Sequence, residues 1–449
     1  MQISKKISRA LKALIVLVMV VALNGALTFV FEPYGSKSQI MWTDYRQQEN
    51  LDTVFVGTSL TERAFDPMYF DSQANSNSYN MATPGQWIEE SQSAMETAIA
   101  DHPINTVVYG LEFSSLQGDK VPHPGRAFYQ YKNQGDPLGF CLDAVRLLSK
   151  PDCYTTADSI NWMFPWITNH VKGLNRTVAN VTMKLDGTSI YDAAEANEPG
   201  WTYYGRGYGN YTDVNDPNKG KQRLYTDDYK NRELSPDKIN VLIEMADYCE
   251  ERGIDFVVVM PPIPSYNIAA YGKSYFAQAE EVRKIVEEHG GEFYDLNMAR
   301  PELFDTTNPE FFADHQHLNK AGGEAASKAI ATIFEARDGG QDVDSLFYTK
   351  DEYRQAMDFI SLVTLKATVT DDGIELKARA LISGDSPVEY QMMVFDPDKK
   401  EWVIIRDWSE DPTYLFDPEE SGQYKVCVNA RLVGTDVEYD RYRVVKVRL

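Results

Sequence analysis

The sequence predicts a three-layer α/β domain with a parallel, flavodoxin-like sheet, preceded by a membrane-spanning helix and followed by an all-β sandwich. Three patterns support this. An uncharged apolar run covers residues 13–31. Short apolar runs then alternate with helical periodicity between residues 51 and 336. From residue 363 to residue 449, apolar and polar residues alternate with the period of a strand that buries one face.

Composition excludes several classes of protein. The chain has 449 residues, enough for two or three domains, and 43% of them are hydrophobic, which excludes a wholly disordered chain. A formal net charge of -23 repels phosphate backbones, so we expect no nucleic-acid partner. The four cysteines include no CxxC pair, which excludes a disulfide scaffold and a zinc ribbon. The sequence indicates no metal centre and no cofactor, although weak calcium sites in its acidic clusters are an alternative.

Residues 13–31 are interpreted as a signal anchor. At about 1.5 Å per residue, a helix of this length nearly spans a hydrocarbon core of roughly 30 Å. Residues 1–12 are basic and hold no acidic residue, so they are expected to stay in the cytoplasm while the rest is exported. A cleaved signal peptide is the alternative. The apolar run is longer than the usual h-region and no A-x-A site follows it, which favours an uncleaved anchor over a signal peptide or a core helix.

After a polar linker at 32–50, the α/β domain is expected over residues 51–340. Its strand candidates are apolar on both faces, which is typical of central strands in a parallel sheet. The predicted strands are 53–56, 106–109, 256–260 and 293–296, and the predicted helices are 87–100, 237–252, 277–289 and 321–336. Ligands of such sheets bind at the carboxyl ends of the strands.

A long insertion of loops and short helices is expected over about 118–235. It is rich in aromatic residues, and flat rings suit sugar faces as well as core packing. Candidate residues for a sugar-binding platform are Trp162, Trp166, Trp201 and Tyr204. Local packing of the insertion is the alternative explanation.

The carboxy-terminal part is expected to be an accessory module. Residues 341–362 form a linker with a helix predicted over 350–362. Residues 363–449 predict a sandwich of roughly seven strands, similar to immunoglobulin-like domains, with a tyrosine corner at Tyr424.

Two distant segments carry the candidate chemistry. Ser59 follows the first strand and a glycine turn, where its hydroxyl would face the carboxyl edge of the sheet and its N–H could stabilise an oxyanion. A serine hydroxyl needs a base to act as a nucleophile. His317 is the candidate base, and Asp314, three residues earlier, would hold its imidazole. His315 is the alternative base.

This order of segments resembles the SGNH/GDSL hydrolase superfamily, in which the nucleophilic serine follows the first strand and a D-x-x-H-L segment precedes the last helix. The resemblance implies a Ser59–His317–Asp314 triad and an oxyanion hole that includes the N–H groups of Ser59 and Gly85. Glu112 stands where the family usually has an asparagine, and an ionised carboxylate cannot donate a hydrogen bond. Another asparagine, such as Asn80, would then supply the donor, and Glu112 would support the site from outside it.

The anchor and the altered motifs together are similar to membrane-anchored SGNH proteins of bacterial envelopes, such as DltD-type D-alanylation proteins and alginate O-acetyltransferases. This similarity implies a single-pass protein of the bacterial cytoplasmic membrane with an extracytoplasmic catalytic domain. It would act as a serine esterase or O-acyltransferase on acyl esters of a cell-envelope polysaccharide or teichoic acid. A multipass membrane-bound O-acyltransferase is a possible partner. The alternatives are a non-catalytic glycan-binding scaffold and an enzyme for a small secreted ester.

Overall fold

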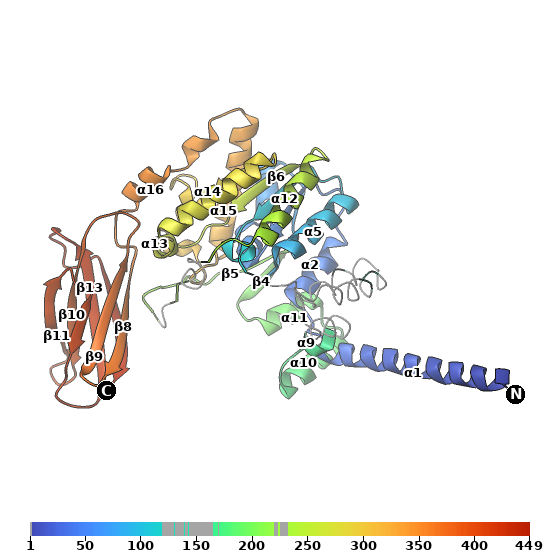
Figure 1. Ribbon diagram of the computed structural model, residues 1–449, viewed down its shortest axis with the longest axis horizontal. Helices are drawn as coiled ribbons and strands as arrows, with labels where there is room; N and C mark the ends of the chain where they lie inside the picture. Colours follow the sequence, from blue (N-terminus) through green and yellow to red (C-terminus); the bar gives the residue numbers. More distant parts are fainter. Residues whose placement is uncertain are drawn as a thin grey trace. The chain divides into compact units, whose positions relative to one another are not determined.

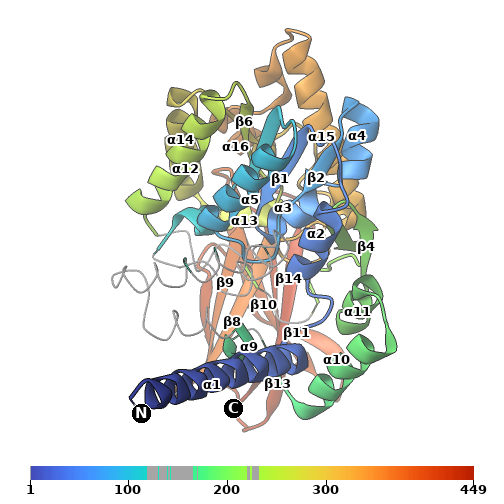
Figure 2. The same ribbon diagram turned by 90° about the vertical axis from the view of Figure 1, so that its right-hand side faces the viewer.

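The computed structural model describes residues 2–118, 165–168, 170–219, 223–224 and 232–449, together with residues 130, 139 and 142 (Figures 1 and 2). These residues fall into two compact units. The first comprises residues 1–211, 234–257 and 289–291. The second comprises residues 212–233, 258–288 and 292–449.

The predicted α/β class is confirmed by a five-stranded sheet with the order β2-β1-β3-β6-β7. The strands are β1 (Thr53–Gly57), β2 (Ser78–Asn80), β3 (Thr106–Gly110), β6 (Asp255–Met260) and β7 (Glu292–Asp295). β1 runs parallel to both β2 and β3 and is buried along its whole length. Its run of apolar residues therefore indicated a central strand correctly.

Helices of the first unit follow the predicted periodicity closely. α5 (Ile88–Asp101) and α12 (Pro236–Glu250) pack against each other. No range was predicted for α3 (Ser59–Ala64) or α4 (Pro67–Ala74), because a helix of six or eight residues is too short to show periodicity. β2, with three residues, was missed for the same reason.

The first unit begins with α1 (Gln2–Phe31), which is followed by α2 (Lys37–Tyr45). The segment Arg9–Phe31 of α1 is long and apolar enough to span a membrane. None of the side chains in its apolar window is buried within the described residues.

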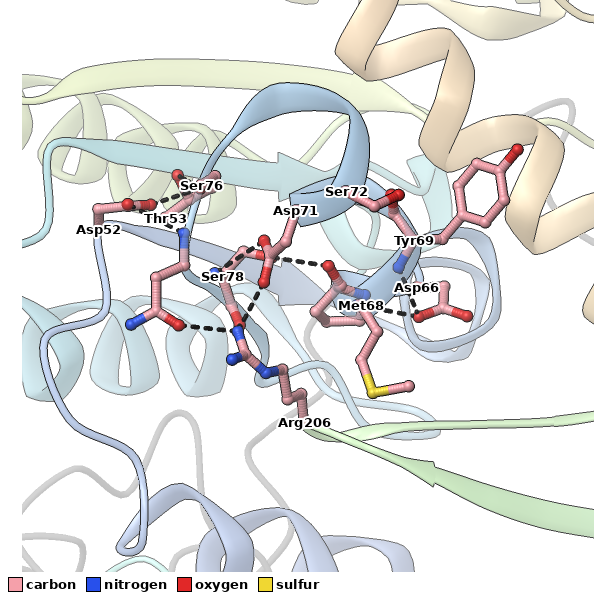
Figure 3. Close-up of polar contacts among 12 residues, drawn as sticks. Asp52, Thr53, Asp66, Met68, Tyr69, Asp71, Ser72, Ser76, Ser78 and Arg206 are labelled. Atoms are coloured by element: carbon pink, nitrogen blue, oxygen red, sulfur yellow. Dashed lines mark hydrogen bonds and ion pairs between the residues drawn. The ribbon is translucent and has the colours of Figure 1, made fainter.

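The described part of the insertion contains a β-hairpin that the sequence did not predict. The insertion forms α9 (Pro165–Thr168), α10 (Leu174–Asp186), α11 (Ile190–Asn197), β4 (Trp201–Gly205) and β5 (Tyr208–Tyr211), the last two antiparallel. The hairpin turn places Arg206 against β2 and α4, where Nη1 of Arg206 donates to Oδ2 of Asp71 at 2.6 Å and to Oδ1 of Asn77 at 2.8 Å (Figure 3). Burial raises the pKa of Asp71 to about 6, and the opposing charge of Arg206 favours its ionised form.

In the second unit, α13 (Ser265–Tyr271), α14 (Lys273–Glu288) and α15 (Lys320–Asp338) accompany the sheet strands. The helix predicted over 350–362 is shorter: α16 (Lys350–Ala356) ends six residues early. The following segment leaves the helix because Ile360 is buried in the core of the sandwich.

The β-rich carboxy-terminal part forms two antiparallel sheets with the orders β11-β10-β13-β14 and β12-β9-β8. The strands are β8 (Leu362–Thr370), β9 (Gly373–Leu381), β10 (Val388–Asp396), β11 (Glu401–Ser409), β12 (Thr413–Phe416), β13 (Gln423–Leu432) and β14 (Arg441–Arg448). Both sheets contribute to one core, for example Leu376 from one and Val428 from the other. The hydroxyl of Tyr424 donates to the carbonyl of Glu420, which confirms the predicted tyrosine corner.

Candidate active site

Ser59 is the first residue of α3 and is separated from the end of β1 by Thr58 alone, so it follows the first strand as the sequence predicts. Thr58 caps the helix: its Oγ1 accepts a hydrogen bond from the N–H of Leu60 at 3.2 Å. Thr58 and Leu60 are buried, whereas Ser59 is partly exposed. The turn therefore buries the residues on either side of Ser59 and leaves the serine accessible.

Two glycines at the carboxyl ends of β1 and β3 make room for α3. A Cβ atom on Gly110 would lie 1.9 Å from Oγ1 of Thr61, and one on Gly57 would lie 2.2 Å from it. This close approach allows Oγ1 of Thr61 to donate to the carbonyl of Gly110 at 3.1 Å. The position of the helix that carries Ser59 therefore depends on the absence of side chains at both strand ends.

We expect Gly110→Ala to displace α3, because the added methyl group has no space beside Thr61. Overpacking of this kind costs roughly 1–3 kcal/mol of the free energy of unfolding. Gly422→Ala is the matched control, since a Cβ at Gly422 meets nothing within 4 Å. Urea unfolding of both variants checks the prediction, and equal midpoints would contradict it.

Glu112 acts as a hydrogen-bond acceptor in this turn. Its carboxylate accepts from Oγ1 of Thr58 at 2.6 Å and also from the hydroxyl of Ser114. Both hydroxyls therefore point their protons at Glu112, which ties the end of β3 to the residue before Ser59. This geometry agrees with the prediction that Glu112 cannot act as an oxyanion donor and supports the serine turn instead. Sequence analysis missed this role of Thr58, because the contact joins residues 54 positions apart.

Glu112→Gln is expected to destabilise the turn, because an amide NH₂ would face a hydroxyl that now donates. One lost charge-assisted hydrogen bond is worth about 1.5–3 kcal/mol. Thermal unfolding measures the change. Glu281→Gln, at an exposed position of α14, serves as the control for the same change from a carboxylate to an amide. An unchanged melting temperature for Glu112→Gln would show that the Thr58 contact contributes little.

The structure corrects the role expected of Asn80. Both hydrogens of its amide are used by the backbone, at 3.1 Å from the carbonyl of Thr61 and 2.8 Å from that of Phe65. Its Oδ1 accepts from the N–H of Ala82 at 3.0 Å. Asn80 is fully buried and ties β2 to α3, so its side chain has no donor left for an oxyanion.

Gly85 lies in an exposed turn of the first unit. Its φ of 65° and the preceding Pro84 are typical of the third position of a type II turn, which only glycine adopts easily. The N–H of Gln86 closes this turn on the carbonyl of Thr83 at 3.1 Å. The exposure of Gly85 is compatible with an oxyanion donor, and that role stays a prediction.

In the second unit, Asp314 and His317 form the pair that their spacing predicted. Nδ1 of His317 lies 2.8 Å from Oδ2 of Asp314. Nε2 of His317 lies 3.2 Å from the amide nitrogen of Gln316, which can only donate. This network assigns the proton to Nδ1 and leaves the lone pair on Nε2, the form that a general base requires.

The loop that carries this pair is held by the backbone. Oδ1 of Asp314 accepts from the N–H groups of Gln316 and His317, both at 2.9 Å. The N–H of Ala313 donates to the carbonyl of His317 at 2.9 Å. Asn319 caps α15, with Oδ1 accepting from the N–H of Gly322 at 3.0 Å. Asp314 and His317 are therefore preorganised by their own loop.

Electrostatics keep Asp314 ionised. Burial raises the pKa of its carboxyl, but the hydrogen bonds and charge of His317 together with backbone donors lower it well below the ordinary value. Because the folded pKa lies below the unfolded one, the stability from Asp314 is present above about pH 4 and is lost in stronger acid. Asp314 thus stays charged where a histidine ordinarily titrates.

His315, the alternative base, is placed differently. Its Nδ1 is 3.9 Å from Oδ1 of Asp314, beyond hydrogen-bond distance. Burial lowers the pKa of His315. Its carbonyl accepts from the side-chain amide of Asn267 at 2.6 Å, which fixes the loop to α13. The geometry favours His317.

The four aromatic residues predicted to bind sugar lie in different surroundings. Trp201 is 3% exposed, and its ring lies under Lys37 and beside Tyr203, so the structure gives it a packing role and no open face for a sugar. Trp166 contacts α1: its indole nitrogen donates to Oδ1 of Asn24 at 2.7 Å. Tyr204 is half-buried against Tyr208, and a role in sugar binding stays a prediction. Trp162 lies outside the described residues.

The hairpin also supports the serine helix. The side-chain amide of Asn210 donates to the carbonyl of Arg63 at 3.1 Å, and the Arg63 guanidinium lies 4.6 Å from the ring centre of Tyr211. Arg63 belongs to α3, so β5 braces the helix that begins with Ser59. Sequence reasoning missed this role because nothing local links residue 210 to residue 63.

A cavity of about 660 Å³ lies within the second unit. It is bordered by the loop before Asp314 and by the sandwich, including Tyr266, Phe312, Tyr439 and Tyr442. The polar groups at its wall include Asp216 and Arg441, so the cavity offers aromatic faces beside hydrogen-bonding groups.

Comparisons with known proteins carry no argument about the fold or the activity of this chain. No family model matches the chain, and no curated protein matches it either. Among solved structures, it is similar to a Bacteroides fragilis protein provisionally described as an acylhydrolase, with 9% identity and a TM-score of 0.31 over 66% of this chain and 94% of that one. A Cellulomonas fimi endo-beta-1,4-mannanase double mutant matches with 12% identity and a TM-score of 0.13 over 93% of this chain and 97% of that chain. Similarities this low carry no argument about activity.

Proposed function

We propose that the protein is a membrane-anchored, extracytoplasmic serine esterase or O-acyltransferase of the SGNH type. The observation that carries the proposal is the preorganised Asp314–His317 pair, with Nδ1 directed at a carboxylate and Nε2 left as an acceptor. An accessible serine at a strand-to-helix turn is the second support.

In this mechanism Ser59 Oγ attacks the carbonyl carbon of an acyl ester while Nε2 of His317 takes its proton. Asp314 stabilises the imidazolium that forms. The tetrahedral intermediate collapses, the carbon–oxygen bond to the leaving alcohol breaks, and His317 returns the proton to that alcohol. The acyl-serine then passes its acyl group to water or to a sugar hydroxyl by the same steps.

The substrate class is proposed from the resemblance and the anchor. An exported domain held at the membrane faces envelope polymers, so we propose a polysaccharide or teichoic acid as acyl acceptor or donor. A multipass membrane-bound O-acyltransferase would supply acyl groups across the bilayer. The aromatic and polar wall of the second unit's cavity suits a sugar chain.

The experiment is turnover of p-nitrophenyl acetate by the full chain in detergent, with and without an envelope glycan. Nitrophenolate release alone supports an esterase, and acetyl groups recovered on the glycan support a transferase. Absence of both products, and of labelling by a fluorophosphonate, would contradict the proposal and support the alternative of a non-catalytic glycan-binding scaffold. The observation that favours this alternative is Glu112, an acceptor at the place where the family has a donor.

A further inference from the structure

The insertion holds an amphipathic helix at the end of the apolar helix α1. α10 (Leu174–Asp186) lies beside the carboxyl end of α1 in both views of the chain (Figures 1 and 2). The last turns of α1 have carbonyl groups without partners in the helix. Two side chains of α10, Asn180 and Lys184, reach them.

The contacts between α10 and α1 are specific. The amide of Asn180 donates to the carbonyls of Val30 at 3.2 Å and Glu32 at 3.0 Å, and its Oδ1 accepts from the N–H of Tyr34 at 2.8 Å. Nζ of Lys184 donates to the carbonyls of Phe29 and Glu32, both at 2.6 Å. A lysine at a helix carboxyl end also complements the helix dipole. α10 thus caps α1 where the apolar segment Arg9–Phe31 ends.

A different face of α10 is apolar and exposed. Leu174, Val178 and Leu185 are 79%, 58% and 73% exposed. Their spacing of four and eleven residues puts them within about 40° of one another around the helix at 100° per residue. Asn175, Thr182 and Asp186 occupy the neighbouring polar face and are exposed as well. This pattern is typical of a helix that lies in a membrane surface.

Residues near α10 are also of types that favour the surface of a membrane. Trp166 of α9 contacts Phe31, with ring centres 6.5 Å apart, and hydrogen-bonds Asn24 within α1. Tryptophan is enriched at the boundary between hydrocarbon and water. Lys172, exposed just ahead of the helix, adds positive charge at the amino end of α10 in a protein that is otherwise strongly acidic. Cations at this place favour anionic lipid headgroups.

We propose that α10 is an interfacial helix that lies in the outer leaflet, with Leu174, Val178 and Leu185 among the upper acyl chains. Continuity with the end of α1 places this apolar face at the height of the bilayer surface. The helix would fix how far the exported domain stands from the membrane. This inference rests on the proposed membrane anchor.

The test uses the full chain in nanodiscs of phosphatidylethanolamine and phosphatidylglycerol. A fluorescent NBD label is placed at Val178→Cys, Thr182→Cys or Val18→Cys, in a background with Cys141→Ser and Cys153→Ser; Cys249 and Cys427 are buried. Lipid-borne nitroxide near the headgroup should quench the label at 178. Iodide in water should quench that label several-fold less than the one at 182, as expected for insertion of about 5–10 Å.

The label at position 18 distinguishes failure of the membrane anchor α1 from failure of the proposed role of α10. If it is protected from iodide while the labels at 178 and 182 are quenched alike, α1 spans the membrane and the role of α10 is wrong. If Val18 itself is open to iodide, the anchor fails and the inference falls with it. Protection at 178 without quenching by lipid nitroxide would indicate a protein partner and would also overturn the proposal.

Adding Leu185→Asp to the Val178→Cys chain gives a matched test. A carboxylate in the apolar face should raise iodide quenching at 178 toward the value at 182. Thr182→Asp in the same chain adds the same charge to the polar face and should leave quenching at 178 unchanged. Circular dichroism of both variants checks that the fold persists.

Discussion

Ser59→Ala is expected to lower the turnover of p-nitrophenyl acetate by about 10⁴-fold or more, because the proposed nucleophile that forms the acyl-enzyme is removed. Folding should be unaffected. Ser59 is partly exposed at the first position of α3, where the cap is made by Thr58 and not by Ser59.

The control is Ser72→Ala, a serine in the neighbouring helix α4 that is exposed and donates only to the carbonyl of Tyr69. Its turnover should equal that of the unmodified chain. Equal activity of Ser59→Ala and the unmodified chain, with the same melting temperature, would mean that the nucleophile lies elsewhere.

His317→Ala is expected to lower turnover by a similar factor, since the serine would lose its base. Asp314→Asn should lower it by about 10³–10⁴-fold, because an amide at this position disfavours the Nδ1–H tautomer. The chain offers a matched control two residues away: His315→Ala removes an imidazole from the same loop, but one whose Nδ1 lies 3.9 Å from Asp314.

Steady-state rates and thermal unfolding of these three variants are compared. The expected order is a large loss for His317→Ala, a large loss for Asp314→Asn and little change for His315→Ala. The reverse assignment, with His315→Ala inactive and His317→Ala active, would exchange the roles of the two histidines.

The parts of the fold that were predictable are those in which one local pattern determines the structure. The run Thr53–Gly57 is buried on both faces, so its composition alone identified a central strand. The helix α15 begins at Lys320 behind Asn319, a capping residue that is visible in the sequence. Asp314 and His317 were found because their spacing of three residues suffices for contact within a single loop.

The rest depended on contacts between distant residues. Asn80 was proposed as an oxyanion donor because it precedes the expected glycine, but its amide bonds to carbonyls 19 and 15 residues earlier. Trp201 was proposed as a sugar platform because it is aromatic, but tertiary packing buries it. Likewise, α10 is capped to α1 across about 150 residues, a pairing that no local pattern reveals.

In the proposed mechanism, Ser59 becomes a nucleophile through His317. The measurement that tests it most directly is peptide mapping, by mass spectrometry, of the full chain after reaction with a fluorophosphonate. We expect a phosphonyl adduct on the peptide that contains Ser59, and its loss in His317→Ala but not in His315→Ala. An adduct on another residue, or equal modification of Ser59 with and without His317, would contradict it.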